Sequence, residues 1–425
     1  MILVDVTCIE KKIKLKDIVF VEEIYARFDL NQSLINDYEE NAEEIINSKN
    51  KISVSQDNIL IDGYHRLKAF ERVYGKEKEI NVIEHQTTNR DYIELQSYKA
   101  NTRHGKRNSR QENMRNISRL YARGFNLDQI QDHLGLSKSL IYDATQKRRK
   151  EEKEERDKKI LESYLRAWNT QQDIADEMGV PRPTVTKIIE SIVQNSACGK
   201  MNKDFQPYFY TIWNQQKGNQ TEHFGSFPKI YMENLLYYHT KPFDIVFDPF
   251  AGDGTTIDVC KDMNRRYFCS DINVKPGREK DIKQHDIADG LPCDLRTADI
   301  AFLDPPYWKQ AKGKYSDSDN DLGNMSLKDF NASMEKVLKE LIGKQVGKIA
   351  IVIQPTQYSN GFELIDHVFD FNKMIDVYRI VARYILPYSS QQYNAQMVEK
   401  AKEKKECLVL HRDLIIWENN DTKKK

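Results

Sequence analysis

The sequence has no apolar run long enough to cross a membrane. A membrane-spanning helix needs about 20 mostly apolar residues, whereas charged residues make up 31% of this 425-residue chain. The first residues, MILVDVTCIEKK, also lack the basic-then-apolar order of a secretory signal peptide. These absences predict a cytoplasmic protein that does not contact a membrane.

Cysteine is scarce and scattered. The chain has six cysteines, with no CxxC pair and no Cys/His spacing typical of zinc ligands. This pattern argues against a disulfide framework and against structural zinc. We therefore expect reduced thiols and no bound metal.

Net charge is also missing, because 65 Lys and Arg residues balance 65 Asp and Glu residues. The balance is uneven along the chain, since residues 101–150 carry 12 basic side chains against 4 acidic ones. A local basic excess favours an anionic partner at that place. The alternative is a solvated helical face with no partner.

Composition and periodicity divide the chain into regions. Residues 1–104 read as mixed α/β, and residues 105–150 and 151–198 read as helical. Residues 199–425 alternate strands with helices, which predicts a mostly parallel sheet. Polar segments at 104–111 and 194–203 are the expected linkers.

The helical region contains the same unit twice, at 126–149 and 169–192. Each copy has an N-cap residue, a short amphipathic helix, a glycine (Gly135 or Gly179) where a left-handed residue closes that helix, and a second helix. This order resembles the helix-turn-helix of bacterial DNA-binding proteins, and a structural helical spacer is the alternative. The side chains expected to contact DNA are Lys138, Ser139, Arg148, Arg182, Thr184 and Lys187.

The segment NILIDGYHRLKAFERVYG, residues 58–75, predicts a strand, a glycine turn and a helix whose N-terminus attracts anions. With the later Asn-x-Arg and the helix-turn-helix, it resembles the ParB/sulfiredoxin-like fold over roughly residues 10–150. That family more often has an acidic residue and two arginines in the turn, where this chain has Tyr64 and His65. The resemblance implies a nucleotide or phosphate site, and purely local pairing of Arg66 is the alternative. The residues concerned are Gly63, His65, Arg66, Asn101 and Arg103.

A second glycine turn lies in FDIVFDPFAGDGTTIDVC, residues 243–260. It matches neither the GxGxxG dinucleotide pattern nor a phosphate-binding loop, because no Gly-Lys-Ser/Thr is present. The acidic Asp253 within the turn instead suits a cationic or hydroxyl-rich ligand. Asp271 and Asp286 then follow the next two predicted strands, where a carboxylate can hold ribose hydroxyls.

The stretch FLDPPYWK, residues 302–309, ends the fourth strand of this region. Proline is poor in a strand interior, so Asp304, Tyr307 and Trp308 are presented at the strand end. The corner thus places a carboxylate, a rigid turn and a flat aromatic side chain together at one strand terminus.

The glycine turn, the two acids and DPPYW, in this order, resemble the DNA methyltransferases that methylate amino groups, over about residues 223–418. The resemblance implies a Rossmann-like domain with a mostly parallel seven-stranded sheet and S-adenosylmethionine as cofactor. Asp271 would hold the ribose and Asp286 the adenine amine of the cofactor. The residues implied along the cofactor are Phe227, Pro228, Asp248, Pro249, Phe250, Gly252, Asp253, Gly254, Thr255, Asp271 and Asp286, and those implied in catalysis are Asp304, Pro305, Pro306 and Tyr307.

The sequence therefore predicts a multidomain protein: a ParB-like α/β domain, two helix-turn-helix units and a methyltransferase domain. Double-stranded DNA is the expected partner, with adenine N6 as the preferred target, as in bacterial or phage restriction–modification enzymes. A homodimer and a nucleotide at the N-terminal domain are left open. The alternatives are a partition or regulatory protein with an idle methyltransferase domain, and a cytosine-N4 DNA or an RNA methyltransferase.

Overall fold

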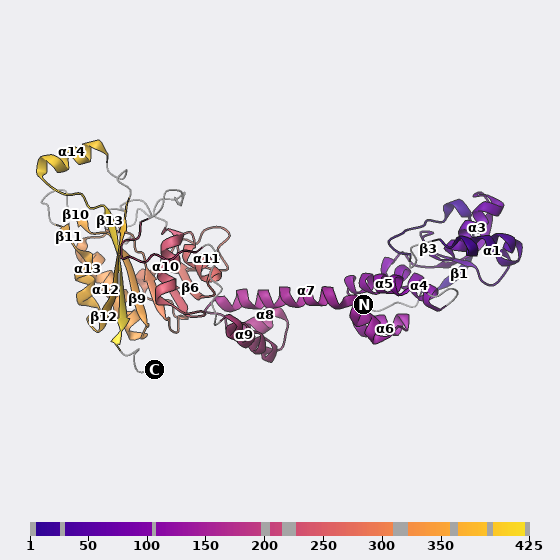
Figure 1. Ribbon diagram of the computed structural model, residues 1–425, viewed down its shortest axis with the longest axis horizontal. Coiled ribbons are helices and arrows are strands. Elements are labelled where there is room, and N and C mark those ends of the chain that lie inside the picture. The colour runs from indigo at the N-terminus through magenta and orange to yellow at the C-terminus, as the bar shows by residue number, and fades with distance from the viewer. Residues whose placement is uncertain are drawn as a thin grey trace. The chain divides into compact units, whose positions relative to one another are not determined.

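The computed structural model divides the chain into two compact units, Met1–Glu154 and Glu155–Lys425, which are described separately here (Figure 1). None of the helices in the described ranges is both long and apolar enough to span a bilayer. Those ranges are 6–25, 30–103, 108–196, 205–214, 227–308, 322–357, 364–388 and 394–420.

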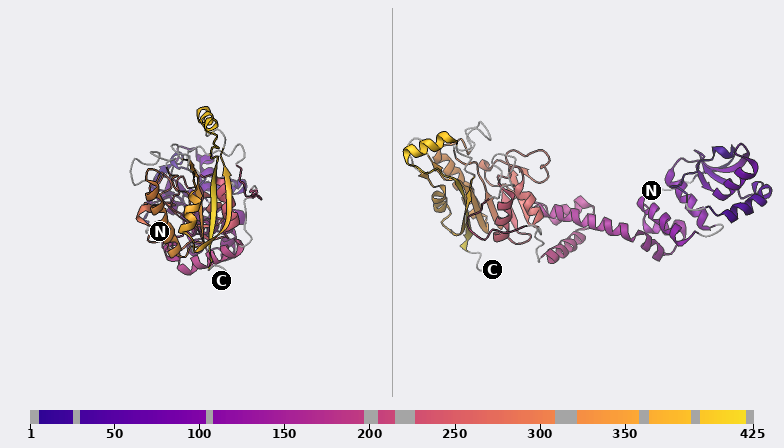
Figure 2. Two further views of the ribbon diagram at one scale, coloured as in Figure 1. Left: turned by 90° about the vertical axis from the view of Figure 1, so that its left-hand side faces the viewer. Right: turned by 45° about the horizontal axis from the view of Figure 1, so that its top comes forward.

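The first unit begins with a four-stranded sheet in the order β1-β4-β2-β3. Strands β2 and β4 are parallel and the other two pairings are antiparallel. Its elements are β1 (Cys8–Lys14), η1 (Leu15–Asp17), α1 (Gln32–Glu40), α2 (Ala42–Ile46), β2 (Ile52–Ser55), β3 (Leu60–Asp62), α3 (Tyr64–Tyr74) and β4 (Glu79–His85). Val54 and Val82 of the sheet and Leu67 and Phe70 of α3 share one buried apolar core. The indigo ribbon in the right-hand view of Figure 2 shows this sheet beside its helices.

Helices make up the rest of the first unit. They are α4 (Arg90–Arg103), α5 (Arg110–Ala122), α6 (Leu127–Leu134) and α7 (Lys138–Leu165), which crosses the division between the units. Tyr98, Ile117, Ile130 and Ile141 meet in one core, one from each helix. Asn126 caps α6, and Gly135 ends it with a φ of 64°. This left-handed turn is the one that the sequence predicts.

The second repeat has the same local geometry and lies in the second unit. Thr170 caps α8 (Gln171–Met178), and Gly179 ends it with a φ of 62° before α9 (Arg182–Ser196). Ile160 of α7 packs with Ile174 of α8 and Val185 of α9. The repeat therefore belongs to the compact unit that contains the large sheet.

The second unit is built on a seven-stranded sheet in the order β12-β13-β9-β8-β5-β6-β7. The pairings of β5 with β6 and β8, of β6 with β7 and of β8 with β9 are parallel, whereas β13 is antiparallel to both β12 and β9. The strands are β5 (Ile245–Asp248), β6 (Arg266–Asp271), β7 (Lys283–Gln284), β8 (Ile300–Leu303), β9 (Lys348–Ile353), β12 (Tyr378–Pro387) and β13 (His411–Asn419), and β10 (Thr356–Gln357) pairs separately with β11 (Leu364–Ile365).

The seven strands and the mostly parallel pairing agree with the prediction, but the sheet is mixed, because two of its six pairings, both made by β13, are antiparallel. Strand β13 is inserted between β12 and β9 and is antiparallel to both, so it runs opposite to the other strands of the sheet. Alternation of strands and helices in the sequence does not reveal this last reversal.

Helices cover both faces of the sheet (Figure 1). The helices α10 (Lys229–His239) and α11 (Thr255–Asp262) share one core with the sheet. On the other face α12 (Leu327–Gly343) and α13 (His367–Met374) share a second core. A short turn, η2 (Ile287–Asp289), precedes β8.

A further helix, α14 (Ala395–Lys404), lies in the sequence between the last two strands. Asn394 caps it by accepting from the Met397 N–H. The residues AQMVEKAKEK are mostly strong helix formers, so local propensity explains the helix that the polar composition obscured.

The second repeat is joined to the sheet through the residues after α7. The Ala167 N–H donates to the Tyr267 carbonyl over 2.8 Å, on the part of β6 that β7 does not pair with. Arg166 Nε donates to Asp281 Oδ1 over 3.0 Å, and the Trp168 ring meets the Phe268 ring edge-on at 5.3 Å. The segment thus extends the edge of β6.

Candidate active site

The predicted site residues of the second unit lie at the carboxyl ends of neighbouring parallel strands. Val246 of β5 pairs with Ile300 of β8, so the turn after Asp248 and the corner at Asp304 leave the same edge of the sheet. Strand β6, on the other side of β5, ends at Asp271 at this edge. Ligand sites of open α/β sheets form at this edge.

The glycine turn connects β5 to α11. Gly252 has a φ of 51° and Gly254 a φ of 87°, a backbone region that favours glycine. The Gly252 N–H donates to Asp271 Oδ2 over 2.8 Å, which ties the turn to the end of β6. A Cβ at Gly254 would lie 3.0 Å from the Arg278 guanidinium. The Arg278 side chain therefore packs closely against the turn at Gly254.

Asp248 fixes the start of the same turn. It is buried, and its carboxylate accepts from the Phe250 N–H over 2.9 Å and from the Thr256 hydroxyl over 2.5 Å. Burial raises the pKa of Asp248 to about 7, and the Asp304 and Asp271 carboxylates add to the rise against these two hydrogen bonds. The Asp304 and Asp271 carboxylates thus both act on Asp248 electrostatically.

The other predicted cofactor residues differ in what they already bind. Asp271 also accepts from the Asn273 N–H over 2.9 Å, and Asp286 caps η2 by accepting from the Ala288 N–H. Both carboxylates are half-buried, and each oxygen keeps a further lone pair for a ligand hydroxyl or amine. Asp253 pairs with the Lys275 ammonium. Pro249 is buried, and Thr255 begins α11.

The DPPYW corner follows β8 directly. The Tyr307 hydroxyl donates to Asp304 Oδ1 over 2.9 Å, which leaves Oδ2 available to a ligand. Burial raises the pKa of Asp304 to about 6, and Arg412 and the Tyr307 hydrogen bond oppose the rise. Pro305 is buried and Pro306 half-buried. Trp308 is buried, and its Nε1 donates to the Met325 carbonyl over 2.9 Å, so this side chain helps to fix the corner in place.

Arg412 joins this corner from a strand that sequence reasoning did not connect with it. Because β13 is antiparallel to β9, its first residues lie at the carboxyl edge of the parallel strands. Arg412 is 8% exposed, and its Nη1 donates to the Tyr307 hydroxyl over 3.4 Å. Its guanidinium lies 5.7 Å from the Phe227 ring centroid and 5.0 Å from that of Tyr388. The sequence signal that could have identified Arg412 is the charged HRD directly before the apolar run LIIW. It places charged residues at the start of a buried strand, where they are rarely found without a role.

Phe227 and Pro228 come to the same edge from the segment before α10. Pro228 is the N-cap residue of α10. The buried Phe227 ring lies 5.0 Å from the ring of Phe302, the residue two before Asp304. The structure thus brings together the glycine turn, the acid-proline-proline corner, Phe227 and Arg412.

The residues proposed for a phosphate in the first unit are held by local contacts. Gly63 has a φ of 102° and begins α3. His65 Nε2 accepts from the Asn31 N–H over 3.0 Å, and Arg66 donates to Asp62 Oδ2 over 2.9 Å. Asn101 is buried and lies within α4, where its side chain donates to the Ser97 carbonyl. Arg103 is the last residue of α4, and its side chain lies outside the described residues. The phosphate site there stays a prediction.

The residues expected to contact DNA lie on two separate helices. In α7, Lys138, Ser139 and Arg148 are exposed, and Arg148 pairs with Glu152 at 3.1 Å. In α9, Arg182 and Lys187 are exposed and Thr184 is half-buried. Their exposure is compatible with a DNA surface, and their role stays a prediction.

Known proteins resemble this chain mainly through short segments. A family profile described as DNA methylase, of the N6/N4 type, matches residues 17–276, more than half of the chain. The Type II methyltransferase M.XycI of Xanthomonas campestris pv. cyanopsidis is 38% identical over 64 residues, 15% of this chain and 21% of that protein. M.BglII of Bacillus subtilis is 40% identical over 52 residues, 12% and 14% of the two proteins. The matched segments thus span about a fifth or less of these relatives.

Similar solved structures include a pNOB8-like ParB N-domain, at 16% identity and a TM-score of 0.23 over 37% of this chain and 55% of that one. An rRNA methylase from Streptococcus thermophilus matches at 13% identity and a TM-score of 0.28, over 46% of this chain and 97% of that one. TM-scores this low carry no argument about function. The profile match, which covers more than half of the chain, does identify the family. The chain belongs to the N6/N4 DNA methylase family, and its cofactor is S-adenosylmethionine.

Proposed function

We propose that this protein transfers a methyl group from S-adenosylmethionine to the exocyclic amine of a base in double-stranded DNA, with adenine N6 as the preferred target. The observation that carries the proposal is the common edge shared by Asp304, at the end of β8, and the glycine turn, at the end of β5. The acceptor for the amine and the turn suited to the methyl donor therefore lie side by side, at the ends of neighbouring strands.

The amine of adenine is a weak nucleophile because its lone pair is delocalised into the ring. Asp304 Oδ2 accepts one N–H and the Pro305 carbonyl accepts the other, which favours a tetrahedral nitrogen with its lone pair directed at the methyl group. S-adenosylmethionine supplies that methyl group as an electrophile on a sulfonium. The protein contributes orientation and electrostatic stabilisation, with no covalent enzyme intermediate.

Tyr307 and Arg412 prepare Asp304 for this role. The Tyr307 hydroxyl occupies Oδ1 and fixes the plane of the carboxylate, and Arg412 opposes the burial that raises the pKa of Asp304. Together they keep the acceptor ionised and oriented near neutral pH.

The base must leave the duplex to reach this edge, which costs a few kcal/mol. The preference for adenine follows from the resemblance, because Asp-Pro-Pro-Tyr is more usual for adenine and Ser-Pro-Pro for cytosine N4. We assign DNA recognition to the two repeats, since no further domain separates the glycine turn from DPPYW.

Sequencing of modified bases in DNA from cells that express the protein tests this proposal, with Asp304→Ala as the matched variant. We expect N6-methyladenine at a defined site with the parent protein and none with Asp304→Ala, while DNA affinity is retained. N4-methylcytosine instead would correct the target base. Methylation of RNA in preference to duplex DNA, or no methylated base at all, would refute the proposal.

A further inference from the structure

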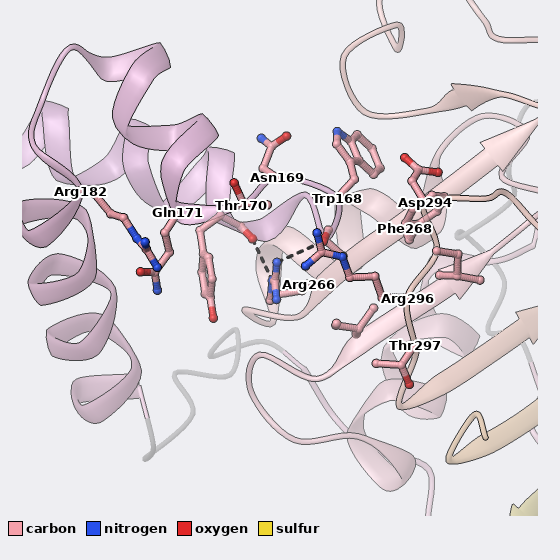
Figure 3. A pocket seen from close by; sticks show the side chains of 14 residues that line it. Trp168, Asn169, Thr170, Gln171, Arg182, Arg266, Phe268, Asp294, Arg296 and Thr297 are labelled. Atoms are coloured by element: carbon pink, nitrogen blue, oxygen red, sulfur yellow. Dashed lines mark hydrogen bonds between the residues drawn. The ribbon is translucent and has the colours of Figure 1, made fainter. Parts of the chain in front are cut away.

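A hollow of about 360 Å³ lies between the second repeat and the sheet, within the second unit (Figure 3). Its walls come from the residues after α7, the start of α9, the first part of β5 and β6, and residues 294–297 before β8. Ile245, the first residue of β5, lines it. The hollow is therefore at the amino edge of the parallel strands, whereas Asp304 lies at their carboxyl edge.

Arginines dominate the charge of this hollow. Arg182 reaches it from α9 and Arg296 from the segment before β8 (Figure 3). Both are exposed, and no ion pair links either of them to an acid among the residues that the structure describes. Arg296 interacts electrostatically with Asp173 of α8 without forming an ion pair with it. Two guanidinium groups from separate elements thus face one space, and neither is held in a salt bridge among the described residues.

The remaining charged groups of the lining are already engaged. Arg266 Nε donates to the Tyr164 carbonyl over 3.0 Å, and its Nη2 donates to the Ala167 carbonyl over 3.3 Å. Asp294 pairs with the Lys283 ammonium. Asp294 is thus neutralised by Lys283. Arg266 donates only to neutral carbonyls, and the acid that acts on it electrostatically, Asp299, is outside the lining. The lining itself therefore keeps an excess of positive charge on its arginines.

We propose that this hollow binds a phosphate group between Arg182 and Arg296. Guanidinium groups bind phosphate oxygens through paired, charge-assisted hydrogen bonds. A pocket of this size is at the lower end of the range for small-molecule sites, about 300–1,000 Å³, so it has room for a phosphate with its sugar. The phosphate is either part of a DNA backbone or part of a free nucleotide.

The position of the hollow separates this phosphate from the target base. A nucleotide whose base enters the carboxyl edge cannot place its own phosphate at the amino edge, a strand length of 4 to 6 residues away, or about 13–20 Å. A backbone phosphate here therefore belongs to another part of the DNA, held jointly by the second repeat and the sheet.

Arg296 distinguishes this proposal from DNA binding by the helix-turn-helix alone, because Arg296 lies outside the repeat. The test compares Arg296→Ala with Arg379→Ala in the full-length protein. Arg379 is a matched control, since it is an exposed arginine on β12, which lies five strands from β6 in the same sheet. Arg296→Gln is the second variant, should Arg296→Ala fail to fold.

Two probes separate the sources of the phosphate. The first is a labelled 30-bp duplex, whose affinity is measured by anisotropy as a function of salt. If the backbone is the source, Arg296→Ala lowers the salt slope by about 1 and the affinity on the order of tenfold, and Arg379→Ala changes neither. The second is about 10 mM sodium pyrophosphate, with NaCl at matched ionic strength as reference. If a free nucleotide is the source, pyrophosphate raises the Tm of the parent and of Arg379→Ala but not that of Arg296→Ala.

A response to either probe supports the phosphate site and identifies its source. An unchanged salt slope together with equal Tm values in pyrophosphate and NaCl would overturn it. Neither readout requires methyl transfer, so loss of the phosphate site and loss of the proposed activity are distinguished.

Discussion

The sharpest consequence of the active-site geometry concerns Arg412. Substituting Arg412 by Met removes the buried cation that opposes the raised pKa of Asp304. Hydrogen bonds of 2.9 and 3.4 Å through Tyr307 place the guanidinium at most about 6 Å from the Asp304 carboxylate. At an effective dielectric constant of about 20, two unit charges at this distance interact by about 3 kcal/mol.

That energy corresponds to a shift of about 2 pKa units, and water that fills the space of the lost guanidinium reduces it. We expect the pKa of Asp304 to rise from about 6 by about 1 unit in Arg412→Met. The ionised carboxylate accepts the amine hydrogen, so activity is lost as pH falls through this pKa. At pH 7 the rate of the variant should be about half that of the parent, and at pH 6 about one fifth of it. Above about pH 8.5 the two rates should be similar.

Single-turnover methylation of a duplex between pH 5 and 9 measures this shift. Arg412→Lys keeps the charge and should retain the midpoint of the parent, even if lost contacts with Phe227 and Tyr388 reduce the rate at every pH. The midpoint, and not the rate, is thus the readout. An Arg412→Met profile that is lower but has the parent midpoint would refute the electrostatic role.

Two further predictions concern the glycine turn. Gly254→Ala should lower the Tm and weaken S-adenosylmethionine binding, because a Cβ there meets the Arg278 guanidinium at 3.0 Å in addition to a backbone strain of about 1–2 kcal/mol. Gly277→Ala is the control, since Gly277 has a φ of 86° with open space around it and its substitution carries the backbone strain alone. Equal losses of Tm and of binding in calorimetry for the two variants would contradict the packing argument. Asp248→Asn should stabilise the protein more at pH 8 than at pH 5. The pKa of Asp248 lies near 7 in the folded protein and near 3.8 in the unfolded chain. The free energy of unfolding of the parent therefore falls as pH rises between these values, by at most about 4 kcal/mol, and the substitution removes this loss. Urea denaturation at the two pH values measures this difference, and a gain independent of pH would exclude a charged Asp248.

Features encoded by a few neighbouring residues could be predicted from the sequence. Both repeats have their glycine in the predicted left-handed conformation, because a helix cap and the residues that end the helix interact over one turn. The glycine turn after β5 and the proline corner after β8 also lie at strand ends as expected. Parallel pairing then brings them to one edge without further information.

Features that depend on contacts between distant residues could not be predicted. Arg412 reaches Tyr307 only because β13 runs antiparallel to β9, and 105 residues separate the two side chains. The second repeat looked like a separate region by composition, yet Ala167 and Trp168 join it to β6 through one hydrogen bond and an aromatic contact. Neither contact leaves a periodic pattern in the sequence.

The amino-acid sequence by itself determined the local chemistry: two glycine-ended repeats, a glycine turn, and an acid held between a strand and two prolines. Short-range sterics and hydrogen bonding are sufficient for these. Only the tertiary structure decided which strand reverses, which arginine stands beside the acid, and that two other arginines face one hollow at the opposite edge. These depend on the order in which strands pair, and strand order follows from the packing of the whole unit rather than from any single segment.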